Sequence, residues 1–299
     1  MGTMGEINVF RATNDGGVVE LGSETVDLEK QIQSLIEENL EELLGIRFLE
    51  TEYSTGKKHG GRIDTLGIDE NNSPVIIEYK KHKNTNVINQ GLYYLDWLMD
   101  HKAQFEQVVE NNISEEVEVD WSVPRLVCIA PDFTKYDSYA VDQIDQNIEL
   151  LRFKRYEEDI LLFELVNTVE STSGGEGPKR EYKGIKEYKE QASDELLQLF
   201  SSSEDFIFAL GDDVQKKELK YYYAYKRIQN FTCIEIRPQK DELRLYIKLD
   251  PDDLEPLPEF ARDVSEIGHY GTGDLELTIS GEEQLDRAKE FIEMSYNGL

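Results

Sequence analysis

The chain has 299 residues, enough for two domains of ordinary size, and its 39% apolar and 31% charged content is typical of a globular protein. A formal net charge of −30 excludes a uniformly basic nucleic-acid-binding surface. No apolar run approaches the roughly 18 residues of a membrane helix, and the N-terminus lacks a signal-peptide pattern, so we expect a cytoplasmic protein with no membrane partner.

The first part of the chain alternates helical and strand-like patterns. Residues 6–21 alternate around an Asp-Gly-Gly turn, as in a hairpin. The patterns that follow are a helix over 25–45, strands at 46–53, 62–68 and 75–81, a helix over 86–110, a strand at 125–131, a helix at 137–144 and strands at 148–156 and 159–166. This order predicts an α/β domain over residues 1–168, with a mixed central sheet flanked by helices and a core of about 25–168.

After residue 168 the composition changes. Residues 169–193 hold few core-forming residues and are interpreted as a linker. Residues 194–299 combine helical stretches with a clear hairpin, which predicts a second, smaller α+β domain. Within it, "KKELKYYYAYKR" at 216–227 is basic and aromatic, so its tyrosines either stack on nucleic-acid bases or pack in the domain core.

Three charged residues interrupt the apolar strands at 62–68 and 75–81. If these strands pair around Asn71, Asp64 lies across from Glu78, and Lys80 shares the Glu78 face. Two carboxylates this close repel each other unless a cation lies between them. Mg²⁺ or Mn²⁺ suits such a pair, with the main-chain carbonyl of Tyr79 as a further ligand. Lys80 is placed to activate water for phosphodiester hydrolysis, although an exposed hairpin with an ordinary salt bridge is the alternative.

This arrangement resembles the PD-(D/E)xK nuclease superfamily, in particular endonucleases of the NucS/EndoMS type. Gln90 and Tyr94 match the Q-x-x-x-Y signature of its RecB-like branch, and "LEKQIQSLIEEN" resembles its first helix. The resemblance implies a restriction-endonuclease-like fold and a Mg²⁺- or Mn²⁺-dependent DNA endonuclease of repair or defence in which Asp64, Glu78, Lys80, Gln90 and Tyr94 are catalytic. It also implies a helix glutamate at the metal, Glu29 by register, with Glu37 as its competitor. Residues 267–279 resemble a C-terminal domain of unknown function found behind prokaryotic nuclease-like domains.

Basic residues gather around the acidic pair. Residues 51–90 are almost neutral within a strongly acidic chain. The candidate DNA contacts are Arg62, Lys57, Lys58, Lys81 and Lys83. A homodimer is plausible for a duplex cutter, since it needs two active sites. The alternative functions are a catalytically silent module that binds nucleic acid or protein on a nuclease fold, and a protein-interaction protein with no role at nucleic acid.

Overall fold

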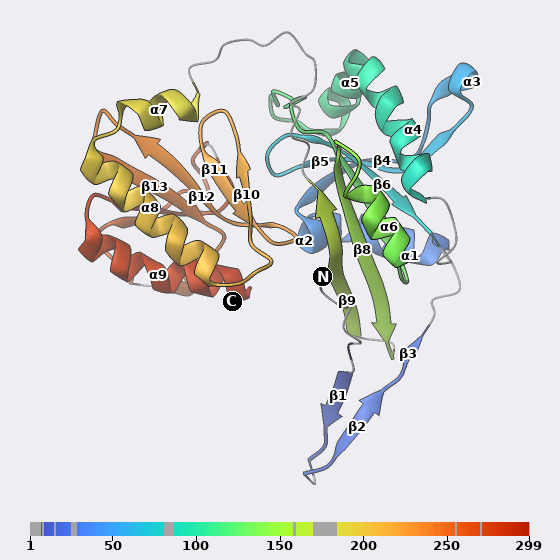
Figure 1. Ribbon diagram of the computed structural model, residues 1–299, viewed down its shortest axis with the longest axis horizontal. Coiled ribbons are helices and arrows are strands. Elements are labelled where there is room, and N and C mark those ends of the chain that lie inside the picture. Colours follow the sequence, from blue (N-terminus) through green and yellow to red (C-terminus); the bar gives the residue numbers. More distant parts are fainter. Residues whose placement is uncertain are drawn as a thin grey trace. The chain divides into compact units, whose positions relative to one another are not determined.

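The computed structural model describes all residues except 1–6, 8, 15, 25–28, 81–86, 158–159, 170–183, 255, 270 and 299. The chain divides into two compact units, Met1–Gly177 (unit 1) and Pro178–Leu299 (unit 2). Figure 1 follows the elements from β1 in blue to α9 in red. Each unit has its own sheets and its own apolar core.

Unit 1 is built on a seven-stranded sheet. Its strands are β3 (Ser23–Glu24), β4 (Ile46–Ser54), β5 (Arg62–Asp69), β6 (Pro74–Tyr79), β7 (Arg125–Ala130), β8 (Asn147–Tyr156) and β9 (Ile160–Val169). Across the sheet the order is β3-β8-β7-β6-β5-β4, with β9 paired to β8. β4, β5 and β6 are antiparallel, β6, β7 and β8 are parallel, and β9 returns antiparallel. The mixed sheet expected from the sequence is confirmed.

Helices flank this sheet. They are α1 (Glu29–Glu38), α2 (Leu40–Leu44), α3 (Gly56–His59), α4 (Val87–Asp100), α5 (Lys102–Asn112) and α6 (Lys135–Val141). α4 packs on β6 and β7, and α2 packs on β4. β6 and β7 are buried along their whole length, which explains why their sequences are apolar runs rather than alternating patterns.

The single helix predicted over 86–110 is two helices. α4 ends at Asp100 and α5 begins at Lys102, with His101 between them. The His101 Nδ1 atom lies 2.7 Å from the Trp97 carbonyl oxygen, and the two rings stack with centroids 4.5 Å apart. The His101 main-chain N–H turns instead to the Leu98 carbonyl. The imidazole therefore replaces the main-chain bond that would have continued the helix.

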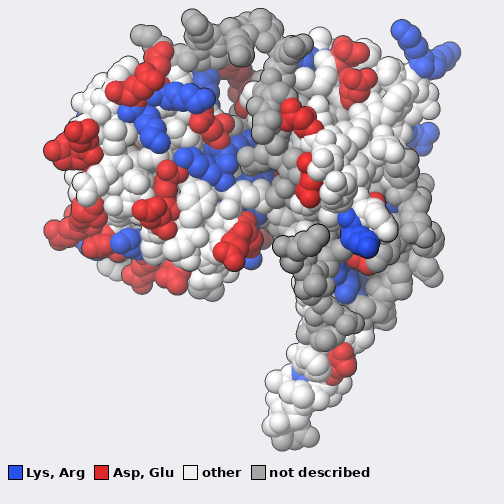
Figure 2. All heavy atoms as spheres, viewed as in Figure 1, with Lys and Arg blue, Asp and Glu red and all other residues white. Residues whose placement is uncertain are grey.

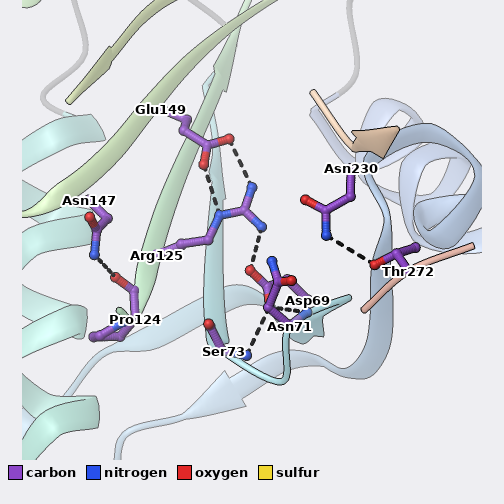
Figure 3. Close-up of polar contacts among 9 residues, drawn as sticks. All are labelled: Asp69, Asn71, Ser73, Pro124, Arg125, Asn147, Glu149, Asn230 and Thr272. Atoms are coloured by element: carbon purple, nitrogen blue, oxygen red, sulfur yellow. Dashed lines mark hydrogen bonds and ion pairs between the residues drawn. The ribbon is translucent and has the colours of Figure 1, made fainter. Parts of the chain in front are cut away.

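A buried ion triad joins three strands at one end of the sheet (Figure 3). Arg125 opens β7 and donates to Asp69 of β5 and to Glu149 of β8 over 2.8–2.9 Å. Asp69 Oδ1 also accepts from the main-chain N–H groups of Asn71 and Ser73, which closes the β5–β6 turn. Burial opposes the charge of Arg125, but the two carboxylates outweigh this and raise its pKa. The triad therefore fixes the turn that sets the β5–β6 register.

A separate two-stranded ribbon precedes the main sheet. β1 (Val9–Ala12) and β2 (Val18–Leu21) pair antiparallel, as the alternation at 6–21 predicts. Arg11 of β1 forms a 2.7 Å ion pair with Glu157, just after β8.

Unit 2 is a six-stranded antiparallel sheet with helices. Its elements are α7 (Ile185–Gln191), α8 (Asp194–Ala209), β10 (Gln215–Glu218), β11 (Tyr223–Lys226), β12 (Asn230–Arg237), β13 (Glu242–Ile247), the 3₁₀ helix η1 (Pro251–Leu254), β14 (Ala261–Asp263), β15 (Leu275–Ile279) and α9 (Glu282–Asn297). The strand order is β10-β11-β12-β13-β15-β14. α7 and α9 pack on β12, and α8 packs on β13 and on α9. The α+β arrangement expected for this half is confirmed.

One detail of unit 2 differs from the sequence interpretation, and a second decides between two alternatives that the sequence left open. α7 lies inside the stretch predicted as a linker, because Ile185, only 2% exposed, anchors it in the unit 2 core. In the basic and aromatic segment, Tyr223 and Tyr225 are buried in the same core, and the Lys216 ammonium lies 4.0 Å from the centre of the Tyr223 ring. These two rings therefore pack in the core and are not available to stack on bases.

The surface carries the acidity of the chain. On the face drawn in Figure 2, acidic side chains are spread over unit 2 with a group of basic side chains among them, and further basic side chains project at the tip of α3 in unit 1. Within the described part of the chain, every helix is too short or too polar to span a bilayer.

Candidate active site

β5 and β6 stop pairing where the acidic residues begin. Their ladder ends at Thr65 and Ile77, in the register centred on Asn71 that the sequence predicts, and the next pair in that register is Asp64 and Glu78. Beyond this point β5 remains paired with β4, and β6 remains paired with β7. The two strands therefore diverge beside the acids and leave a gap between them.

Both acidic side chains bond to the main chain of the opposite strand across this gap. The Asp64 N–H donates to Glu78 Oε1 over 3.2 Å, and the Tyr79 N–H donates to Asp64 Oδ2 over 3.0 Å. Glu78 is 0% exposed, whereas Asp64 is half-buried. The carboxylates thus replace the ladder bonds that the diverging strands no longer make, and they share one small region of the sheet.

α4 brings two polar side chains to the same region. Gln90 Nε2 donates to Glu78 Oε2 over 2.8 Å, and the Arg62 N–H donates to the Tyr94 hydroxyl over 3.1 Å. Gly61 allows the Tyr94 ring to lie against the main chain, because a Cβ there would be 2.5 Å from Tyr94 Cε1. The i, i+4 spacing therefore sets Gln90 on the buried acid and Tyr94 on the start of β5.

Lys80 directly follows β6 and is half-buried. Its main-chain N–H donates to the Ile129 carbonyl over 2.9 Å, which extends the β6–β7 pairing by one residue. Burial raises the pKa of the Cys128 thiol, the Glu78 carboxylate adds to that rise, and the Lys80 charge opposes it. Lys80 and Glu78 therefore both act on Cys128, as expected for side chains two residues apart along one strand.

Of the two α1 glutamates considered from the sequence, Glu37 is the one seen to reach β5. Its Oε1 atom accepts from Thr65 Oγ1 and from Gln33 Nε2, the latter over 3.0 Å. Glu29 begins α1, but its side chain lies outside the described part of the structure.

Three carboxylates affect the ionisation of the Tyr79 hydroxyl. Burial raises the pKa of its hydroxyl, the Thr65 hydrogen bond opposes that rise, and Glu37, Asp64 and Glu78 add to it. The negative charges of all three acids therefore disfavour ionisation of the Tyr79 hydroxyl.

Sequence reasoning missed Gln33 and Thr65. Gln33 is 6% exposed and donates to the Asp64 carbonyl over 2.8 Å. Thr65 is fully buried beside Tyr79. The available signal was a polar residue on the apolar face of the first predicted helix, one turn before Glu37.

The predicted DNA contacts that the structure describes belong to the segment entering β5. Lys57 and Lys58 are exposed on α3. Arg62 is exposed at the start of β5 and forms a 2.9 Å ion pair with Glu52 of β4. Two further predicted contacts lie outside the described residues: Lys81 and Lys83.

The donor set suits Mg²⁺ or Mn²⁺. Asp64 and Glu78 supply hard carboxylate oxygens, and Tyr79 supplies a main-chain carbonyl at the end of β6. Mg²⁺ is commonly held by one or two carboxylates while it keeps several waters. Among the described residues, no three acidic, histidine or cysteine side chains come together as a metal-binding group. A cation here would therefore rely on the carboxylate pair, the main chain and water.

Comparison with known proteins gives two sequence relationships. Residues 185–298 match the family model described as a domain of unknown function, DUF5655. An uncharacterized protein of Haemophilus influenzae is 33% identical over 298 residues, which covers 94% of this chain and 96% of that protein.

Two solved structures are similar to part of the chain. A complex of EndoMS with double-stranded DNA is 20% identical with a TM-score of 0.31, covering 42% of this chain and 44% of that chain. A repair endonuclease from Pyrococcus abyssi is 20% identical with a TM-score of 0.30, covering 45% of this chain and 51% of that chain. The chain thus spans about half the length of these solved chains.

Proposed function

The chain belongs to the same family as the uncharacterized Haemophilus influenzae protein, and from the site that it carries we propose that it is a metal-dependent DNA endonuclease. The observation that carries this proposal is the gap between β5 and β6. It brings the Asp64 and Glu78 side chains together on diverging strands, beside Lys80 and under the helix that carries Gln90. Acidic groups in a buried sheet are costly, and a shared cation would add to the hydrogen bonds that already offset this cost at Asp64 and Glu78.

Asp64, Glu78 and the Tyr79 carbonyl would hold Mg²⁺ or Mn²⁺. When bound, such an ion polarises the phosphoryl oxygens and favours ionisation of water. Asp64 is the half-buried acid and therefore the one open to solvent and substrate. Glu78 is fixed from two sides, by the Asp64 main chain and by Gln90, which sets its carboxylate before any substrate arrives.

The remaining residues of the chain orient water and substrate. Lys80 is half-buried at the end of β6, where its ammonium can orient the attacking water and stabilise negative charge that develops on the phosphoryl group. Gln90 keeps one amide proton beyond the bond to Glu78, because its NH₂ group has two donors. Tyr94 fixes the entry into β5 through Arg62. Together these groups position the scissile phosphate against the acids.

The substrate proposed is DNA. Lys57, Lys58 and Arg62 form an exposed basic segment leading into β5, in a chain whose overall charge of −30 repels nucleic acid. We propose that this segment binds the phosphate backbone of DNA. Two copies of the protein would act together on a duplex, in DNA repair or in defence.

The test is a cleavage assay with Mg²⁺, Mn²⁺ or EDTA on plain duplex, mismatched, flap and single-stranded DNA. Asp64→Asn and Lys80→Ala are compared with the exposed, matched control Asp96→Asn on α4. We expect metal-dependent cleavage that falls by at least about 100-fold in the first two variants, as for a lost catalytic group, and stays unchanged in the control. No metal-dependent cleavage of any substrate, or cleavage that survives Asp64→Asn, would overturn the proposal.

One observation favours a second candidate, a silent binding module on the same fold. Glu78 is fully buried, and each of its oxygens already accepts a hydrogen bond from the protein. A carboxylate satisfied in this way is also compatible with a purely structural role. DNA affinity that falls steeply with salt, without turnover in any metal, would support this module, whereas cleavage would exclude it.

A further inference from the structure

Glu37 is the centre of a hydrogen-bond network on α1 and β5. Its Oε1 atom accepts from both Gln33 Nε2 and Thr65 Oγ1. Glu37 Oε2 accepts no hydrogen bond recorded among the described residues, and the side chain is half-buried. One oxygen of this carboxylate is therefore committed to the protein.

The network reaches two of the three residues that are proposed to hold a metal. Gln33 Nε2 donates to the main-chain carbonyl of Asp64 over 2.8 Å. The Thr65 and Tyr79 hydroxyls are 3.3 Å apart. Thr65 Oγ1 is the donor to both Glu37 Oε1 and the Tyr79 hydroxyl, so its single proton is shared between these two acceptors. Glu37 thus holds the main chain of Asp64 through Gln33 and the side chain of Tyr79 through Thr65.

The network approaches β5 from the side opposite the acidic pair. Successive side chains of a strand point to opposite faces, so Thr65, which bonds to Glu37, points away from Asp64. Gln33 completes the arrangement from the interior: it is 6% exposed and lies within 2.8–3.1 Å of three acceptors, the third being Thr51 Oγ1. An NH₂ group has only two protons, so one of them is shared and the amide has no freedom to turn.

We propose that Glu37 is a positioning residue rather than a metal ligand, and that it acts through Gln33 and Thr65 to hold Asp64 and Tyr79 in place. This inference rests on the proposed metal-dependent function. It departs from the expectation, drawn from the nuclease resemblance, that a glutamate of the first helix joins the metal. What the site needs from Glu37 is an acceptor oxygen for two donors, and a negative charge is not required for that.

The experiment distinguishes a Glu37 that only accepts hydrogen bonds from a Glu37 that binds the metal directly. Mn²⁺ affinity is measured by calorimetric titration, together with the thermal midpoint and the cleavage rate, for Glu37→Gln, Glu37→Ala, Gln33→Met and Asp64→Asn. Glu38→Gln, the exposed neighbour on α1, is the matched control. Glutamine keeps an oxygen that accepts both bonds at the reduced strength of a neutral group, so we expect Mn²⁺ affinity to fall less than about fivefold in Glu37→Gln.

The other variants remove the network. Glu37→Ala and Gln33→Met should weaken Mn²⁺ binding by about 10- to 100-fold, as for other residues that orient metal ligands, and slow cleavage in step. Rescue by Glu37→Gln relative to Glu37→Ala is the signature of positioning. If Glu37→Gln loses Mn²⁺ binding as completely as Asp64→Asn, Glu37 is a ligand and this inference fails while the proposed function stands. If the wild-type protein binds no Mn²⁺, both fail.

Discussion

Gly61→Ala tests whether the Tyr94 contact positions the site. A Cβ at Gly61 would lie 2.5 Å from Tyr94 Cε1 and 3.0 Å from the Tyr94 hydroxyl oxygen, whereas ordinary contacts begin near 3.4 Å. The loop itself is held, because Thr55 and Gly61 make three hydrogen bonds of 3.0–3.1 Å. The ring must therefore retreat by about 1 Å, which breaks its bond to the Arg62 N–H and tilts α4 at Gln90.

A misplacement of this size costs on the order of 100-fold in catalysis, and overpacking costs about 1–3 kcal/mol of folding stability. We expect kcat/KM for DNA cleavage to fall about 100-fold in Gly61→Ala, while urea unfolding still shows a cooperative transition. The control is Gly22→Ala, since a Cβ at Gly22 meets nothing within 4 Å. Unchanged kcat/KM in Gly61→Ala would refute the claim that Tyr94 and Gln90 position the site.

Three further predictions address stability and binding. Arg125→Met should lower the free energy of unfolding by about 3–5 kcal/mol, measured by urea titration, because two buried carboxylates lose their counter-charge; a loss below about 1 kcal/mol would contradict this. Stability should also decline above about pH 9, because the folded-state pKa values of Cys128 and Tyr79 are raised, so the unfolded chain releases these protons first. Each of these two groups lowers the free energy of unfolding by about 1.4 kcal/mol per pH unit above its pKa in the unfolded chain. A free energy of unfolding that stays level from pH 8 to 11 would disprove this prediction. Finally, replacing Lys57 and Lys58 by alanine should weaken DNA binding and reduce the slope of log affinity against log salt by about two, whereas an unchanged slope would remove both as phosphate contacts.

The β5–β6 register could be predicted from the sequence because it depends on local patterns. A polar turn lies between two apolar runs, and the alternation along each run allows few registers. Once that turn was centred on Asn71, the opposition of Asp64 and Glu78 followed. The divergence of the strands beside them could not be predicted, since it depends on the pairing of β5 with β4 and of β6 with β7 along their other edges.

The contribution of α1 was harder to predict. Helical periodicity identifies the apolar face, but it does not say where along β5 the helix crosses. The sequence register favours Glu29, whose side chain lies outside the described part of the structure, and the structure shows its competitor Glu37 bonded to Thr65. These two positions are eight residues apart, about 12 Å along the helix axis, so tertiary packing decides which of them lies near β5.

Local sequence patterns also give the wrong secondary structure at two places where a side-chain contact in the folded chain determines it. The break at His101 carries no glycine or proline and arises from a ring that takes the Trp97 carbonyl. The sequence of α7 resembles a linker because Ile185 is the one buried residue of this helix, with the partly buried Tyr188 packed beside it. In both cases a side-chain contact that forms only in the folded chain decides the local structure.

The central claim is that Asp64 and Glu78 share a divalent cation in the gap between β5 and β6. The most direct measurement is anomalous diffraction from a crystal soaked in Mn²⁺. The account predicts an anomalous peak in contact with both carboxylates, absent from a soaked Asp64→Asn crystal. Anomalous density only elsewhere, or a peak that persists in Asp64→Asn, would contradict it.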